Sequence, residues 1–292
     1  DVTGKQGENA IFIVYGLKQS NNTIKQVKDL CANFSALIRS MRNRFPEMQF
    51  SCTIGFGADA WKQLFPEQGN PKELKTFETI KGAKYTAVST PGDILLHIRA
   101  KQMGLCFEFA SIIDEKLKGV VDSIDETHGF RYMDGKAIIG FVDGTENPAV
   151  DENPYHFAVI GDEDPDFIGG SYVFVQKYIH DMTAWNSLPV EAQEKVIGRH
   201  KYNDVELSDE EKPQNAHNAV TNIGDDLKIV RANMPFANTS KGEYFSTTHK
   251  MLENMFIGDP VGNTDRLLDF STPITGTLFF APSYDLLAKL GE

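Results

Sequence analysis

The sequence predicts an α+β protein made of two similar units in tandem. The chain has 292 residues, more than the roughly 100–200 of a typical domain, so two units of about 145 residues are expected. In the first half, segments with the two-residue period of strands and the 3.6-residue period of helices follow in the order β-α-β-β-α-β. The second half repeats this order coarsely. The order predicts two tandem ferredoxin-like domains with antiparallel sheets.

The first half contains the clearer pattern. Four of its segments have strand character: residues 10–17, 48–56, 93–100 and 120–132. Two have apolar side chains at helical spacing: residues 23–45 and 103–117. Thr23 is expected to be the N-cap of the first helix because its hydroxyl can accept a hydrogen bond from a free backbone amide.

The second half is less regular. Its predicted strands are residues 155–160, 171–179, 227–236 and 276–280. Its predicted helices are residues 189–197 and 248–256. Turn-forming residues follow Pro148, so we place the boundary there, between domains of residues 1–148 and 149–292.

Charge and composition exclude several classes of protein. The chain carries 29 basic and 41 acidic residues, a net charge of −12, which disfavours nucleic acid as a partner. No apolar stretch approaches the roughly 20 residues of a membrane span, and the residues after Asp1 do not read as a signal peptide. The three cysteines form no C-x-x-C pair, which is typical of reduced thiols. We therefore expect a cytoplasmic protein with no membrane partner.

Residues 140–148 (GFVDGTENP) contain the first candidate site residue. An apolar segment, residues 137–142, is predicted to be a strand that ends at Asp143 and a polar turn. A strand end of this kind presents one carboxylate from a rigid element. The alternative is an Asp-Gly turn without a further role.

Residues 227–236 (LKIVRANMPF) contain two more candidate site residues, Arg231 and Asn233. With the period of a strand, Arg231 and Asn233 share one face with Leu227 and Ile229. An arginine among apolar neighbours needs an anionic partner, which is either a ligand or a structural carboxylate.

The remaining polar and aromatic candidates have simpler interpretations. His217 is in a predicted loop, and His97 is expected to be a hydrogen-bonded residue of a strand. Trp61 and Trp185 are expected in the core. The acidic residues 161–170 (GDEDPDFIGG) do not match a calcium-binding loop, so we interpret them as a solvated loop.

Five stretches taken together closely resemble the dye-decolourising peroxidase family of haem proteins, in its short bacterial branch without a signal peptide. They are GFVDGTENP, GGSYVFVQKYIHDMTAWNSLP, EKVIGR, LKIVRANMPF and GDPVGNTDRLLDFSTPITGTLFFAPS. The resemblance extends over residues 129–282, and the preceding part agrees in element order alone. It implies one non-covalent haem b per chain, held mainly by the C-terminal domain.

The resemblance also implies roles for individual residues. Asp143 matches the distal acid of the family, Arg231 its distal arginine, Asn233 a further distal polar residue and His217 the axial ligand of the haem iron. Four other residues are implied to support the cofactor: Arg199 at a haem propionate, Gly144 and Thr145 beside the haem, and Asp226 (or its neighbour Asp225) as the acceptor that orients His217.

The implied function is that of a peroxidase. Hydrogen peroxide would oxidise the haem to a high-valent ferryl intermediate, which then oxidises small aromatic or dye-like donors. The alternatives are a haem-binding, haem-trafficking or iron-releasing protein, and a ferredoxin-like binding module without haem. Exposed sheet edges favour a homo-oligomer. Residues 241–251 are shorter than the corresponding stretch of the family, which predicts a more open distal pocket or residues missing from the sequence.

Overall fold

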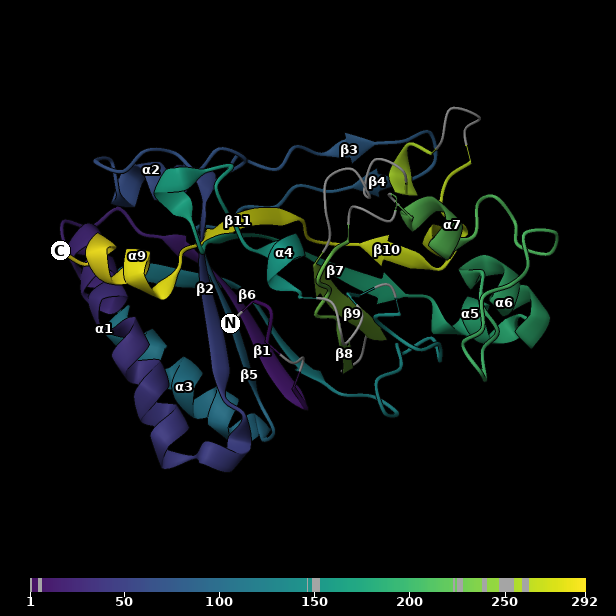
Figure 1. The fold of residues 1–292 in the computed structure, drawn as a ribbon, viewed down its shortest axis with the longest axis horizontal. Coiled ribbons are helices and arrows are strands. Elements are labelled where there is room, and N and C mark those ends of the chain that lie inside the picture. The colour runs from purple at the N-terminus through teal and green to yellow at the C-terminus, as the bar shows by residue number, and fades with distance from the viewer. Residues whose placement is uncertain are drawn as a thin grey trace.

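The structure, a computed structural model, has one long antiparallel sheet with helices packed against it (Figure 1). It describes residues 2–4, 7–145, 147–148, 153–222, 224, 228–237, 241–246, 255–258 and 263–292, with residues 241–246 described by their backbone alone. No helix among the described residues combines the length and apolar character that crossing a membrane requires.

Eight strands form the main path of the sheet. In spatial order they are β6 (Val121–Phe130), β1 (Asn9–Leu17), β5 (Ile94–Ala100), β2 (Ser51–Gly57), β11 (Thr277–Ala281), β7 (Ser171–His180), β9 (Lys241–Ser246) and β8 (Met234–Ala237). A ninth strand, β10 (Ser271–Pro273), pairs with β7, and β3 (Ile80–Lys81) and β4 (Thr86–Ala87) form a separate hairpin.

The sheet curls so that its two ends meet. Gly129 of β6 lies against Met234 of β8, where a Cβ atom on residue 129 would be only 2.7 Å from Cβ of Met234. Lys177 of β7 also forms an ion pair with Asp125 of β6. The close approach therefore requires glycine at position 129.

Helices cover one face of the N-terminal part of the sheet (Figure 1). They are α1 (Thr23–Arg44), α3 (Met103–Lys116) and the C-terminal α9 (Tyr284–Leu290). The largest hydrophobic cluster lies between them and the strands, and it includes Trp61 of α2 (Ala58–Leu64) as predicted. Because this cluster is shielded from water, it is the main source of hydrophobic stabilisation in this half.

The predicted elements of the first half are confirmed, with α2 and the β3–β4 hairpin inserted between them. The prediction for Thr23 is wrong. Asn22 precedes the helix, and Thr23 is its first residue. The Thr23 hydroxyl donates instead to the carbonyl of Lys18, 2.8 Å away.

The second half departs further from the predictions. The predicted strands at 171–179 and 276–280 are confirmed as β7 and β11, and the helix at 189–197 is α6 (Val190–Ile197). The strand predicted at 155–160 is wrong, because that segment begins with the short helix α4 (Tyr155–Ala158). The side chain of Asn153 accepts a hydrogen bond from the Tyr155 amide at 3.1 Å and Pro154 has helical φ, which together initiate the turn.

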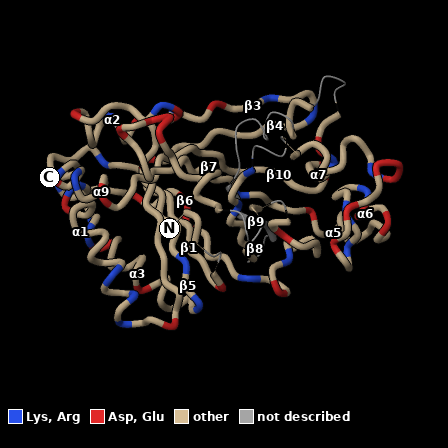
Figure 2. Tube along the Cα trace, viewed as in Figure 1, with Lys and Arg blue, Asp and Glu red and all other residues tan. Residues whose placement is uncertain are grey.

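The two predicted domains share a single sheet. Strand β11 from the C-terminal half pairs with β2 of the N-terminal half, and α9 packs against α1. The division at residue 148 stays a prediction. Lys and Arg are interspersed with Asp and Glu along the described chain (Figure 2).

Candidate functional site

Asp143 follows a tight turn that a buried tryptophan holds in place. The segment 137–142, predicted to be a strand, instead forms a turn in which the Ala137 amide donates to the Phe141 carbonyl at 2.8 Å. Gly140 has φ +92°, a conformation that favours glycine and prevents a continuous strand here. The indole of Trp185, in α5 (Met182–Ser187), donates to the Ile139 carbonyl at 2.9 Å.

Asp143 is held through both its backbone and its side chain. Its backbone amide donates to the Gly135 carbonyl at 3.0 Å, and Gly144 after it has φ +76°, so the chain turns sharply away. The buried side chain of Asn233 donates from Nδ2 to Oδ1 of Asp143 at 2.7 Å. The structure therefore brings together two residues that are 90 positions apart in the chain.

Arg231 and Asn233 lie just before β8 and not within a long strand. Of the strand predicted at 227–236, Met234–Ala237 is β8, residues 228–233 are irregular, and Leu227 lies outside the described residues. The predicted alternation of sides holds for residues 230–233 but is wrong for Ile229, which was expected on the face of Arg231 and lines the other cavity instead. Arg231 and Asn233 line one cavity, while Val230 and Ala232 line another.

Asn147 joins the Asp143 turn to Arg231. Its Oδ1 accepts from the Arg231 amide at 2.8 Å, and its Nδ2 donates to the Arg231 carbonyl at 3.0 Å. The motif GFVDGTENP contains Asn147, yet nothing in the spacing of that motif indicates that its partner is the backbone of Arg231.

His217 begins the short helix α7 (His217–Thr221) and faces the same cavity. Its Nδ1 lies 2.7 Å from Oδ2 of Asp265, and its side chain is 18% exposed. Asp265 is fully buried, and its other oxygen accepts from the Leu267 amide at 2.8 Å. One carboxylate thus orients the imidazole and is itself fixed by the backbone.

Sequence reasoning missed Asp265. Asp226 and Asp225, predicted for this role, lie outside the described residues. Asp265 and His217 are 48 positions apart, so no local pattern connects them. Asp265 is part of the stretch GDPVGNTDR, which contributed to the family resemblance. That stretch was the signal in the sequence that could have pointed to Asp265.

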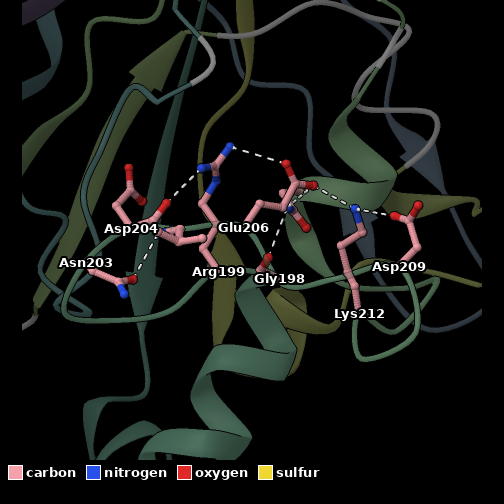
Figure 3. Close-up of polar contacts among 9 residues, drawn as sticks. Gly198, Arg199, Asn203, Asp204, Glu206, Asp209 and Lys212 are labelled. Carbon is pink, nitrogen blue, oxygen red and sulfur yellow. Dashed lines mark hydrogen bonds and ion pairs between the residues drawn. The ribbon is translucent and has the colours of Figure 1, made fainter.

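Arg199 lines the cavity from the end of α6 (Figure 3). Its Nη1 donates to the Asp204 carbonyl at 3.0 Å, and its Nη2 is 3.9 Å from the carboxylate of Glu206. Glu206 also binds Lys212 at 2.6 Å and accepts from Asn218, the residue after His217, at 3.0 Å. This network connects the arginine to the helix that presents His217.

The cavity therefore gathers most of the predicted site residues. Asp143, Thr145, Arg199, His217, Arg231 and Asn233 all line it, together with apolar side chains such as those of Phe141, Ile197 and Leu268. Gly144 supplies the turn beside them. Of residues 241–251, 241–246 form β9, and 247–251 lie outside the described residues. The prediction of an open pocket there stays a prediction.

Comparisons with known proteins identify relatives of the whole chain. The family profile "Dyp-type peroxidase, N-terminal" matches residues 1–131, and "Dyp-type peroxidase, C-terminal" matches residues 134–286. A dye-decolorizing peroxidase of Rhodococcus erythropolis is 49% identical over 294 aligned residues, which span 96% of this chain and 85% of that protein.

Solved structures agree in both fold and sequence. The crystal structure of a dye-decolorizing peroxidase from Bacteroides thetaiotaomicron has a TM-score of 0.98 and 80% identity, covering 100% of this chain and 98% of that one. A variant of DypB from Rhodococcus jostii RHA1 in complex with heme has a TM-score of 0.93 and 42% identity, covering 99% and 97%.

Proposed function

The chain belongs to the Dyp-type peroxidase family, and from this premise we propose which of its residues carry out the reaction of a haem-dependent peroxidase. The enzyme reduces hydrogen peroxide and oxidises a second substrate. We propose a small aromatic, dye-like molecule as that substrate. The haem, when bound, supplies the iron that exchanges electrons with both substrates.

The pair His217–Asp265 is the observation that carries the proposal. Because Asp265 engages Nδ1 of His217, Nε2 is the ring nitrogen that would bind the haem iron. A buried carboxylate on Nδ1 makes the imidazole a stronger electron donor and fixes its tautomer. The donor set therefore fits a haem, whose iron His217 would hold.

Arg199 is the proposed partner of a haem propionate. Its guanidinium lines the same cavity as His217, and planar bidentate recognition of carboxylates favours arginine. The described walls enclose about 80 Å³, below the ~300 Å³ at the low end of small-molecule sites. A porphyrin at this site would need more room than the described walls enclose.

Asp143 and Arg231 are the proposed catalytic residues. Asp143 takes a proton from one oxygen of hydrogen peroxide and delivers it to the other, as a general base and then a general acid. The Arg231 guanidinium stabilises the negative charge that develops on the departing oxygen. Asn233, by donating to Asp143 at 2.7 Å, holds this carboxylate in position.

Rapid mixing of the ferric haem protein with one equivalent of hydrogen peroxide tests the proposal. We expect a change of the Soret band within milliseconds, and its loss in the double variant Asp143→Ala/Arg231→Leu. An unchanged Soret band in the unmodified protein would instead favour haem binding or iron release, the alternative function. Asp143 and Arg231 line the same cavity, which supports the peroxidase function because storage of haem needs no proton transfer.

Two further properties follow from the sequence alone. We propose that the chain forms a homo-oligomer and resides in the cytoplasm. Light scattering coupled to size-exclusion chromatography measures the first property, and fractionation of the source cells measures the second.

A further inference from the structure

The β3–β4 hairpin brings residues of the N-terminal half to the part of the chain that carries Asp265 (Figure 1). Lys84 and Tyr85, in the turn of the hairpin, both donate to Oδ1 of Asp269. Asp269 is the last residue of the short 3₁₀ helix η3 (Arg266–Asp269), and Asp265 is the residue just before this helix. The hairpin thus binds one end of a helix whose other end is Asp265.

The helix η3 connects the two carboxylates. Oδ1 of Asp265 accepts from the Leu267 amide at 2.8 Å, and the Asp265 carbonyl accepts from the Leu268 amide at 3.2 Å. Because these hydrogen bonds close within a helix of four residues, Asp265 and Asp269 move as one unit. Oδ2 of the same Asp265 carboxylate lies 2.7 Å from Nδ1 of His217. A displacement of Asp269 therefore alters the hydrogen bond on His217.

Gly82 allows the hairpin to lie close to the chain segment that precedes η3. A Cβ atom at position 82 would be only 1.8 Å from the carbonyl oxygen of Phe256, so a larger residue must displace one of the two backbones. The neighbouring residue Met255 lines the proposed haem cavity, and its carbonyl accepts from the Asp265 amide at 3.1 Å. The hairpin therefore reaches Asp265 by a second route, through the backbone of residues 255 and 256.

Apolar side chains of the hairpin complete the contact. Ile80 and Ala87 are paired across the two strands, and both belong to a buried cluster with Leu268 of η3. Leu268 also lines the proposed haem cavity. An isolated two-stranded hairpin is marginally stable in water, so this one is ordered by the surface on which it packs. The hairpin and η3 therefore fix each other in position.

The charge on Asp269 strengthens the polar contacts. Burial by itself raises the pKa of Asp269, but the hydrogen bonds from Lys84 and Tyr85 lower it below its usual value, so the carboxylate is ionised at neutral pH. Hydrogen bonds to an ionised group are shorter and stronger than those between neutral groups. The Tyr85 side chain is half-buried, whereas that of Lys84 is 63% exposed and its ion pair is weakened by water, so the phenol contributes more.

We propose that Tyr85 and Lys84 are positioning residues for the haem site. By holding Asp269 they fix η3, and η3 presents Asp265 to His217. The hairpin thereby retains the haem, because an imidazole whose Nδ1 lacks its acceptor holds a metal more weakly. This inference rests on the proposed role of His217 as the haem ligand.

Transfer of haem from the ferric protein to an excess of apomyoglobin tests the proposal. Tyr85→Phe removes one partly exposed hydrogen bond and should increase the rate of haem loss about fivefold. Lys84→Met should increase this rate about twofold, because an exposed ion pair contributes less. Gly82→Ala forces the hairpin away from Phe256 and should increase the rate at least as much as Tyr85→Phe.

Two variants elsewhere in the chain are matched controls. Tyr172→Phe removes a phenol whose hydroxyl lies 3.4 Å from the carboxylate of Asp164. Lys118→Met removes an ammonium group paired with Glu115 at 3.1 Å. Tyr172 and Lys118 are not among the described residues that line the proposed haem cavity, so the rate of haem loss should be unchanged in both variants.

The same substitutions in the Asp265→Ala background separate positioning from packing. Tyr85→Phe should have no further effect on haem loss there, because the acceptor through which Tyr85 acts is missing. A hairpin that only packs against the cavity would speed haem loss to the same extent in both backgrounds. Hydrogen–deuterium exchange of residues 265–270 in the haem protein gives a second readout. Amide exchange should be about fivefold faster in Tyr85→Phe and unchanged in Tyr172→Phe.

Three results would overturn the proposal. They are unchanged haem loss in Tyr85→Phe and Gly82→Ala, equal effects of Tyr85→Phe and Tyr172→Phe, and an effect of Tyr85→Phe that is undiminished in the Asp265→Ala background. If Tyr85→Phe fails to fold, Lys84→Met gives the same comparison, because its side chain is exposed.

The variant His217→Ala separates this inference from the proposed function. Loss of the Soret band in His217→Ala, together with unchanged haem loss in the hairpin variants, would contradict the role of the hairpin alone. A Soret band that persists in His217→Ala would contradict both the proposed haem ligand and the role of the hairpin. The rate of haem loss is measured without peroxide, so it does not depend on catalysis.

Discussion

The side chain of Asn147 binds both backbone polar groups of Arg231, accepting from the amide at 2.8 Å and donating to the carbonyl at 3.0 Å. An asparagine amide matches a backbone amide in this way because it has a carbonyl and an NH₂ group side by side. The two hydrogen bonds tie the turn that carries Asp143 to the segment that carries Arg231. The relative position of the two proposed catalytic groups depends on them.

Replacement of Asn147 by alanine should therefore lower kcat/KM for hydrogen peroxide about 10- to 100-fold, since displacement of a catalytic group by 1 Å costs about that much. The Soret band should be unchanged, because Asn147 does not line the haem cavity. Asn153→Ala is the control. Asn153 also bonds to a backbone amide, that of Tyr155, but away from Arg231. Equal losses in the two variants would contradict the positioning role.

Asp143→Ala and Arg231→Leu should each reduce the rate of the reaction with hydrogen peroxide by a factor of about 10² or more. The double variant should lose less than the product of the two single effects, because the two groups act on the same O–O bond. Stopped-flow measurement of the Soret change in the unmodified protein, the two single variants and the double variant gives the coupling free energy between Asp143 and Arg231. Fully multiplicative losses would show that the two residues act independently.

Asp265→Ala should increase the rate at which haem is lost to an excess of apomyoglobin. The acceptor on Nδ1 of His217 is then missing, and the loss of such a partner typically weakens metal binding 10- to 100-fold. Asp265→Asn keeps an oxygen acceptor, so its rate of haem loss should lie between those of the unmodified protein and of Asp265→Ala. His217→Ala should abolish the His-dependent Soret band. Haem loss from Asp265→Ala at the unmodified rate would remove Asp265 from the proposed site.

His97 should make the protein less stable in acid. Burial lowers the pKa of its imidazole well below the usual 6.5, so the unfolded chain binds a proton near pH 6 that the folded chain does not. Stability from this group is present above pH 6.5 and is lost as the pH falls below it.

Urea unfolding at pH 7.5 and 5.5 measures this effect. The unmodified protein should lose about 1 kcal/mol more than His97→Phe between these two pH values, because only it must keep the buried imidazole of His97 neutral. Each protein is compared with itself, so a difference in stability at pH 7.5 does not enter. The same loss in both proteins would contradict the assignment.

The sequence predicted the first half of the fold well and the site in part. Strand and helix periods in residues 9–130 are strong because each element buries one face against the same core. The alternation of residues 230–233 also correctly placed Arg231 and Asn233 on one side, although only Met234–Ala237 became a strand. The segments 137–142 and 155–160 were mispredicted because a positive-φ glycine and a proline with an asparagine turn override their apolar character.

The sequence by itself determined the family, the order of the N-terminal elements, and the identity of Asp143, Arg231, Asn233 and His217 as candidates, because periodicity and motifs are local properties of the chain. Only the tertiary structure decided that Asp265 orients His217, that Asn147 holds Arg231, and that Phe12, His97 and Thr53 form the floor of a second cavity. The residues in these relationships are far apart in the chain. The smallest separation is 41 positions, from Phe12 to Thr53, and the largest is 85 positions, from Phe12 to His97. Hydrogen bonds and strand pairing at such separations leave no pattern in the sequence of either partner, because they depend on how elements that are far apart in the chain are arranged in space.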